Sequence, residues 1–322
     1  MQRMRIAVLD LGTNVFNMIL SEFTPQGGCK IVKEYKCAAK LGAGGLSNGL
    51  IAPTAFDTAT AALDKIMAAI EEAGGADKII PYATSAVRDA SNGLEFANFL
   101  NARYGFEIRI IPGEREAELI FKGIMESVGH LRGSDGKFAT GENALMLDIG
   151  GGSNEFIITD GEQILWKRSF PIGMARMREK FNYAEPISPE VVEEFEQFNN
   201  GVLQELWEQV ERYRPGIFIG SSGSFDTFKD LIFNCGYSEL PSIELKREDL
   251  EKLNDVLVAS VAQERLQMPG MSQIRVDYIV LASIFTQFVL HKVNPRIVYQ
   301  SSYSLKEGGM KEEFEKYLKE NI

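Results

Sequence analysis

Two segments of the chain repeat one arrangement, in which an apolar run ends at an aspartate and a glycine-containing turn follows. The first is DLGTN at residues 10–14 after IAVL at 6–9, and the second is DIGGGSN at 148–154 after ALML at 144–147. Both apolar runs have the length and composition of buried strands. Glycine lets the backbone approach a ligand closely, and successive N–H groups in such a turn form a concave anion site. The repeat predicts two related half-molecules facing each other across a phosphate and its metal ion.

Length and charge limit the classes of protein to which the chain can belong. Its 322 residues are many for a single core, so two domains are expected. The net charge of -11 argues against general attraction to nucleic acid or to an anionic membrane. A polyanionic substrate would also be repelled, and would need a local basic groove.

The cysteines and histidines form no recognisable metal-binding or catalytic pattern. Cys29, Cys37 and Cys235 lack metal-ligand spacing, which favours structural thiols in a reducing cytoplasm. His130 and His291 lie far apart in the sequence, which argues against a zinc site or a histidine-based triad.

The sequence predicts a cytoplasmic protein without a membrane partner. The apolar run after the basic start stops at Asp10, too early for a signal peptide. The longest uncharged apolar stretch, residues 278–290, is too short to span a bilayer, and we expect a buried helix there.

Strand-like and helix-like segments alternate, which predicts an α/β architecture. We expect strands at residues 5–9, 16–22, 30–36, 79–83, 107–111, 145–147, 155–159, 163–170, 217–219 and 297–300. We expect helices at residues 55–73, 94–104, 115–128, 189–213, 247–262, 276–289 and 309–320. A polar loop at 131–143 indicates a nearby boundary. The first domain is expected at residues 1–126, joined by a closing helix at 308–322, and the second at 127–307.

Four patterns in order carry a resemblance to a known family. They are DLGTNV at residues 10–15, ATSAVRDASN at 83–92, GEREA at 113–117 and DIGGGSNE at 148–155. Together they resemble the exopolyphosphatase/guanosine pentaphosphate phosphohydrolase (Ppx/GppA) family, with weaker matches at residues 171–173, 220–224, 268–270 and 304–308. The resemblance covers essentially the whole chain. It implies a two-domain actin-like fold, of the ribonuclease H-like, sugar-kinase and heat-shock-ATPase superfold, with an active site in an interdomain cleft.

The chain departs from the family pattern at several positions. Val15 replaces the second serine of the first turn, so one hydroxyl donor to phosphate is missing. Asn17 stands where a basic residue or histidine is common, and Lys306 replaces an expected arginine. Long family members carry C-terminal helical domains, one of them like the HD phosphohydrolases, and we expect this chain to be a short form without them. These departures bear on substrate preference more than on reaction type.

The residue types suit hydrolysis of a phosphoanhydride, which needs charge neutralisation, an oriented water and in-line geometry. Backbone N–H groups of the two turns are expected to bind phosphate oxygens, at Gly12, Thr13, Asn14, Gly150, Gly151, Gly152 and Ser153. Asp10 and Asp148 are candidate ligands of Mg²⁺, or of Mn²⁺ in its place. Arg88 offers a planar fork for phosphate. The resemblance implies that Glu116 orients or deprotonates the attacking water.

Each assignment has a structural alternative. Asp10 alone would be read as a turn former, and its repetition at Asp148 favours function. Glu116 or its neighbour Glu114 could simply stabilise the helix dipole. Arg88 could be a surface ion-pair partner. Glu155 is predicted near the metal ion but could be an ordinary strand residue, and residues 220–224 could approach a nucleotide or form only a tight turn.

A basic cluster follows the second half of the pattern, at Arg168, Arg176, Arg178 and Lys180. Such a cluster is often a solvated face, and in an acidic protein that binds polyanions it is a candidate path for the distal part of the substrate. Lys36, Lys40 and Lys306 are lesser candidates.

The resulting expectation is Mg²⁺-dependent release of terminal phosphate from inorganic polyphosphate or guanosine pentaphosphate, with guanosine tetraphosphate as a related ligand and a homodimer as the assembly. A small-molecule phosphotransferase of the same superfold and a non-catalytic alarmone sensor are the alternatives. ATP-dependent transfer to an acceptor would identify the first, and tight binding without turnover the second.

Overall fold

The structure is a computed structural model that describes residues 3–24, 26–45, 48–234 and 240–321, so the prediction for Cys235 lies outside the described residues. It divides into two compact units, one formed by Met1–Gly123 with Ser304–Ile322 and the other by Ile124–Tyr303. The divisions fall close to the positions 126 and 307 expected from the sequence. The closing helix is part of the first unit.

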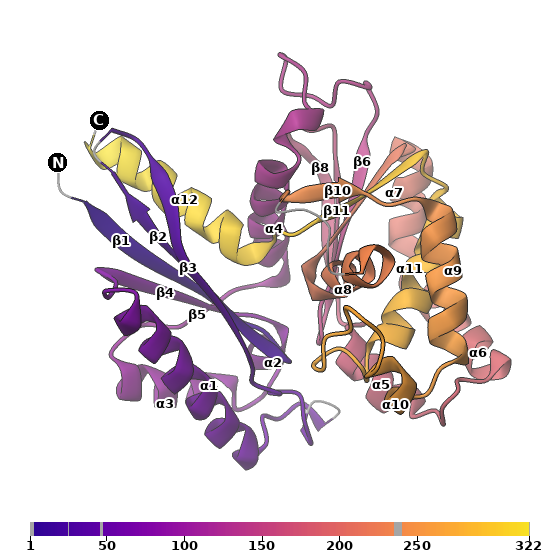
Figure 1. Cartoon of the computed structure of the whole chain (residues 1–322), viewed down its shortest axis with the longest axis horizontal. Coiled ribbons are helices and arrows are strands. Elements are labelled where there is room, and N and C mark those ends of the chain that lie inside the picture. Colours follow the sequence, from indigo (N-terminus) through magenta and orange to yellow (C-terminus); the bar gives the residue numbers. More distant parts are fainter. Residues whose placement is uncertain (1–2, 25, 46–47, 235–239, 322) are drawn as a thin grey trace. The chain divides into compact units, whose positions relative to one another are not determined.

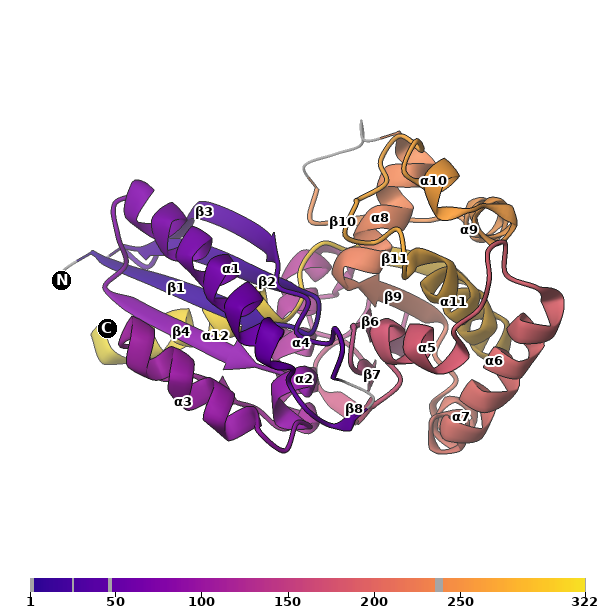
Figure 2. The ribbon, with the colours of Figure 1, turned by 90° about the horizontal axis from the view of Figure 1, so that it is seen from below.

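Unit 1 contains a five-stranded sheet in the order β3-β2-β1-β4-β5. Strands β1 (Met4–Leu11), β2 (Val15–Phe23) and β3 (Cys29–Ala38) form an antiparallel meander, while β4 (Lys78–Ala83) is parallel to β1 and β5 (Arg109–Ile110) is parallel to β4. Helices α1 (Pro53–Glu72) and α3 (Gly93–Tyr104) cover one face, and α12 (Leu305–Asn321) covers the other (Figures 1 and 2). Unit 1 also contains the short helix α2 (Ser85–Arg88) and the start of helix α4 (Gly113–Ser127).

Helix α1 shows why the sequence makes these elements. Proline occupies its first turn, where a missing N–H costs no helical hydrogen bond. One side of the helix is buried, and it carries Ala55, Ala59, Ala62, Leu63, Ile66, Ala69 and Ile70 at helical spacing. It ends before Gly74 and Gly75, whose positive φ values of 95° and 81° suit glycine.

Unit 2 contains a six-stranded sheet in the order β10-β11-β9-β6-β7-β8. Strands β6 (Ala144–Ile149), β7 (Asn154–Thr159) and β8 (Ile164–Phe170) form an antiparallel meander. Strands β9 (Ile217–Ser221) and β11 (Ile297–Ser301) add in parallel, and β10 (Ser242–Glu244) closes the edge. The meander followed by two parallel strands repeats the plan of unit 1, so the predicted relation between the two halves is confirmed at the level of topology.

The helices of unit 2 enclose a continuous apolar core. They are α5 (Met174–Phe181), α6 (Pro189–Val202), α7 (Gln204–Tyr213), α8 (Ser222–Phe233), α9 (Arg247–Ala259), α10 (Ala262–Arg265) and α11 (Ile279–Val293). Residues 279–290 of α11 are all buried, as expected for the apolar stretch 278–290. No helix in the described part of the chain is both long and apolar enough to cross a bilayer.

Several predicted boundaries were wrong. The single helix expected at 189–213 is broken at Leu203, just after the poor helix formers Asn199, Asn200 and Gly201. Residues 222–233 form α8, whereas the sequence predicted no helix there and only a turn at 220–224. The closing helix begins at Leu305, earlier than the predicted 309. Gly308 and Gly309 belong to the helix because they pack closely against neighbouring elements, where a side chain would not fit.

Candidate functional site

The first acid-glycine turn connects β1 to β2 in unit 1. A Cβ on Gly12 would lie 2.9 Å from the Val15 carbonyl oxygen, so the tight turn requires glycine there. Asp10 pairs across the sheet with Asn17, whose amide Nδ2 donates to Asp10 Oδ2 at 3.1 Å. Asn17 thus holds the Asp10 carboxylate in place, which is the one role the structure gives this departure from the family pattern.

The loop at residues 39–42 binds the carbonyl groups of this turn. The N–H groups of Ala39 and Lys40 donate to the Asn14 oxygen at 2.9 and 3.0 Å, and Gly42 donates to Thr13 at 3.2 Å. Since the N–H of a trans peptide points opposite to its carbonyl, the N–H groups of Asn14 and Val15 point away from the loop. The turn therefore has the polarity of an anion site.

The predicted catalytic acid and the predicted phosphate fork are partners in unit 1. Arg88 at the end of α2 donates from Nη1 to Glu116 Oε2 at 2.7 Å, and also to the Ile111 carbonyl at 3.2 Å. Glu116 is only 6% exposed in the first turn of α4, whereas its rival Glu114 is exposed. A favourable interaction with the helix dipole requires only an acid in the first turn, and that acid can be exposed. Glu116 is instead buried and paired, so the helix dipole alone does not explain its position. Its catalytic role stays a prediction.

The second turn, between β6 and β7 in unit 2, is bound from behind by the start of α5. N–H groups of Met174, Ala175 and Gly173 donate to the carbonyls of residues 150, 151 and 152 at 2.9, 2.8 and 3.2 Å. Arg176 Nε adds a bond to the Gly152 oxygen at 2.8 Å. The N–H groups of residues 151–153 consequently point away from α5, as the corresponding groups of the first turn point away from their loop.

The carboxylates around the second turn are held by hydroxyl groups. Ser221 Oγ donates to Asp148 Oδ2 at 2.8 Å. Glu155 Oε1 accepts bonds from Ser153 Oγ at 2.7 Å and from Ser169 Oγ at 2.6 Å. Because the Ser153 hydroxyl hydrogen is used in this way, the residue offers a phosphate its backbone N–H rather than its side-chain donor. Glu155 is buried in this arrangement and fixes Ser153.

Arg275 was not predicted from the sequence, and Ser221 was predicted only as part of the stretch 220–224, without its contact to Asp148. The Arg275 guanidinium lies against Gly223 in the first turn of α8, where any side chain would overlap it. Burial lowers the pKa of Arg275, and the carboxylates of Asp226 and Asp148 oppose that shift. The only sign of this contact in the sequence was Gly223, because a glycine within a helix often marks a close approach by another group.

The four predicted cations of the basic cluster have different surroundings. Arg168 on β8 pairs with Glu205, and Arg176 is bound to the glycine turn. Arg178 stacks on the ring of Tyr183, and Lys180 lies over Phe198. The structure therefore separates Arg176, which binds the turn, from Arg168, Arg178 and Lys180, which contact a glutamate or aromatic rings.

Lys306 forms ion pairs within unit 1. The carboxylates of Glu307 and Glu34 hold it and raise its pKa, although burial opposes the shift.

A cavity of about 500 Å³ in unit 1 is lined by residues from the loop before α1 together with Phe56, Asn92 and Glu95, and by no predicted site residue.

The donors near Asp148 suit a hard cation only if other ligands complete its shell. Within the described ranges, no group of three or more histidine, cysteine, aspartate or glutamate side chains is arranged to hold a metal ion. Mg²⁺ is commonly held by one or two carboxylates, with waters and substrate phosphates supplying the remaining ligands. Asp10 in unit 1 and Asp148 in unit 2 each offer one carboxylate of the kind that this mode of binding uses, and the metal ion stays a prediction.

Comparison with known proteins places the chain in a family. A model of the Ppx/GppA phosphatase family matches residues 21–317. Exopolyphosphatase 1 of Mycobacterium tuberculosis is 25% identical over 317 residues, which are 95% of this chain and 87% of the relative. The crystal structure of an exopolyphosphatase from Cytophaga hutchinsonii is 32% identical, with a TM-score of 0.90 over 97% of this chain and 98% of that one.

A Ppx/GppA family member from Aquifex aeolicus is 21% identical and shares the fold, with a TM-score of 0.76 and complete coverage of both chains. The predicted α/β fold class is confirmed, because each unit is a mixed sheet with helices. The resemblance first seen in four short patterns thus extends over nearly all of the sequence, and the chain belongs to the Ppx/GppA phosphatase family.

Proposed function

We propose that the protein hydrolyses terminal phosphoanhydride bonds and releases phosphate from inorganic polyphosphate. The observation that carries this proposal is shared by both turns. In each turn, N–H groups of a neighbouring segment donate to the carbonyls of the turn. The N–H groups of the turn itself therefore point away from that segment and are available to a phosphate. The names of the relatives from Mycobacterium tuberculosis and Cytophaga hutchinsonii support polyphosphate as the substrate.

The proposed reaction is attack by water on the terminal phosphoryl group. Glu116, oriented by Arg88, accepts a proton from water while the water oxygen bonds to the terminal phosphorus. The bridging P–O bond breaks, and the shortened polyphosphate leaves with its electron pair. Backbone N–H groups at residues 14 and 151–153 stabilise the charge on the phosphoryl oxygens. Mg²⁺, held by Asp148 with support from Asp10, would supply further charge neutralisation when bound.

Guanosine pentaphosphate is the second proposed substrate, because its 5′ end presents the same kind of bond. The cytoplasm is the proposed location, and a homodimer the proposed assembly.

The test is phosphate release by the purified protein from polyphosphate and from guanosine pentaphosphate, with Mg²⁺, with Mn²⁺ and with a chelator. We expect release from polyphosphate that needs the divalent ion and no acceptor molecule. Phosphate transfer from ATP that requires an acceptor would show a phosphotransferase instead. Tight binding of guanosine tetraphosphate without any release would show a sensor.

A further inference from the structure

Helix α12 packs on α4 and on the sheet of unit 1 through two adjacent glycines. A Cβ on Gly308 would overlap the Leu119 carbonyl oxygen of α4, and one on Gly123 would overlap the Ser304 carbonyl. A Cβ on Gly309 would lie 2.9 Å from the Tyr82 ring of β4. The backbones of α4 and α12 are therefore in direct contact, and there is no room for a side chain at Gly308 or Gly309.

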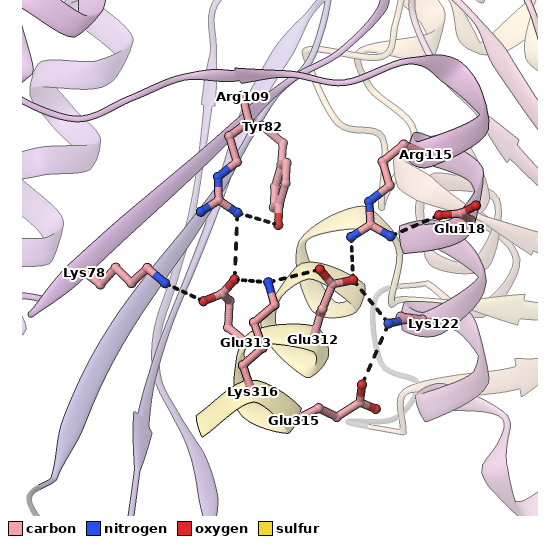
Figure 3. Close-up of polar contacts among 10 residues, drawn as sticks. All are labelled: Lys78, Tyr82, Arg109, Arg115, Glu118, Lys122, Glu312, Glu313, Glu315 and Lys316. Carbon is pink, nitrogen blue, oxygen red and sulfur yellow. Dashed lines mark hydrogen bonds and ion pairs between the residues drawn. The ribbon is translucent and has the colours of Figure 1, made fainter. Parts of the chain in front are cut away.

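Two consecutive acids on α12 reinforce these contacts with ion pairs (Figure 3). Glu312 binds α4, with Arg115 at 2.5 Å and Lys122 at 3.2 Å. Glu313 binds the sheet, with Lys78 of β4 at 2.7 Å and Arg109 of β5 at 3.8 Å. Lys316 lies between them, 3.2 Å from Glu312 and 2.9 Å from Glu313. One turn of α12 thus holds α4 and the sheet together.

The Glu116–Arg88 pair joins α4 to the segment that follows β4. Arg115 and Glu116 are consecutive in α4, about 100° apart around the helix, so one faces α12 while the other faces Arg88. Leu119, Lys122 and Gly123 continue the side that faces α12. Arg88 follows β4 by way of the short α2. The position of Glu116 relative to Arg88 therefore depends on how α4 lies against β4.

We propose that Glu312 is a positioning residue for the hydrolysis, because it binds α4 to α12, which Glu313 in turn binds to β4, and so sets the place of Glu116. This inference rests on the proposed function insofar as Glu116 orients the attacking water. A misplacement of about 1 Å can cost about a hundredfold in rate. The side chain of Glu312 is 16% exposed and binds two cations of α4, so its charge is suited to prevent such a shift.

The test compares Glu312→Gln with Glu315→Gln. Glu315 also lies on α12, but its side chain is 44% exposed and its ion pair with Lys122 is long, at 3.8 Å. We expect Glu312→Gln to lower kcat by about tenfold to a hundredfold with KM unchanged, and Glu315→Gln to leave both unchanged. Equal kcat in the two variants would overturn the proposal. If Glu312→Gln does not fold, Lys122→Gln, which removes one partner of Glu312, replaces it with the same expectation.

Two further measurements separate positioning from a general structural effect. In a Glu116→Gln background, Glu312→Gln should cause no additional loss of kcat, because both changes act through the same carboxylate. A full additional loss would overturn the proposal. Hydrogen exchange at the amides of α4 should accelerate in Glu312→Gln and not in Glu315→Gln, and unchanged exchange would also overturn it. Because exchange needs no substrate, it distinguishes failure of this inference from failure of the proposed activity.

Discussion

At the scale of single residues, the pairing of Glu116 with Arg88 changes how both predictions are understood. The sequence suggested a water-orienting acid and a separate phosphate fork, and the structure joins them at 2.7 Å. Arg88 also donates to the Ile111 carbonyl, so its guanidinium is anchored at the base of α4. Arg88 is thus placed to orient the acid, and its direct role toward phosphate stays a prediction.

Glu116→Gln tests the acid with little change of shape. We expect kcat for phosphate release to fall by about two to four orders of magnitude, as is typical when general-base assistance is lost. Binding of polyphosphate, measured separately, should persist. Glu114→Gln is the matched control, since Glu114 is exposed in the same helical turn. Near-normal turnover in Glu116→Gln together with a loss in Glu114→Gln would exchange the two assignments.

At the scale of elements, α5 serves the second glycine turn and carries most of the basic cluster. Its first N–H groups and Arg176 bind the turn's carbonyls, whereas Arg178 and Lys180 lie further along and stack on aromatic rings. The cluster therefore contains two kinds of cation, one that shapes the turn and others that could attract a polyanion.

Neutralising the two kinds of cation should have different effects. The triple change Arg168→Gln, Arg178→Gln and Lys180→Gln should raise KM for long polyphosphate and flatten its salt dependence, because electrostatic steering is reduced. Guanosine pentaphosphate should be affected less. Arg176→Gln should lower kcat for both substrates, since the Gly152 carbonyl loses a partner. Lys252→Gln, at an exposed position of α9, is the control. Equal losses for both substrates in the triple variant would show an effect on folding or on the site itself.

The ionic contacts of α12 make its anchoring depend on pH. Although burial alone would raise it, hydrogen bonds from Arg115 and Lys122 hold the pKa of Glu312 at about 2, below the ordinary 4.5. A carboxylate with a depressed folded pKa contributes stability above its unfolded pKa and loses it as the pH falls through the folded value. We expect the free energy of unfolding, measured with urea, to decline between pH 4.5 and about 2. Glu312→Gln should show a weaker decline than Glu315→Gln, and parallel curves would contradict this account.

The elements also show what the sequence could and could not predict. The meanders after Asp10 and Asp148 were predictable, because apolar runs and glycine turns are local patterns. Helix α8 was missed because Gly220 and Gly223 suggested a turn, and only the packing of Phe225 and Arg275 against those glycines explains their place. The contact of Ser221 with Asp148 and the place of Arg275 beside Gly223 were missed for a related reason. The partners in these contacts are distant in the sequence, and no local pattern indicates such contacts.

At the scale of the whole molecule, the two units differ in how the chain forms them. Unit 2 is one continuous segment, and its large apolar cluster, from Leu145 to Val298, lies entirely within it. Unit 1 is built from two segments, and its second segment supplies the helix that covers one face of its sheet. The units are expected to differ in their dependence on the closing helix.

Deleting residues 304–322 should destabilise unit 1 and spare unit 2. We expect a fragment of residues 124–303 to unfold cooperatively on heating, as followed by circular dichroism, because it keeps its complete core. In the deletion variant, limited proteolysis should cut residues 1–123 first, since the sheet loses the cover of α12. A non-cooperative transition in the fragment, or equal protease sensitivity of both units in the variant, would contradict this division.

The interrupted path of unit 1 also bears on the order of events during synthesis. A ribosome releases the chain from its N-terminus, so residues 1–123 emerge well before α12, with all of unit 2 made in between. One face of the unit 1 sheet stays uncovered until α12 has been synthesised. Unit 2, in contrast, has all of its strands and helices once residue 303 has left the ribosome. The half of the molecule that is translated later is therefore expected to become native first, and Glu116 to take its final place only when α12 arrives.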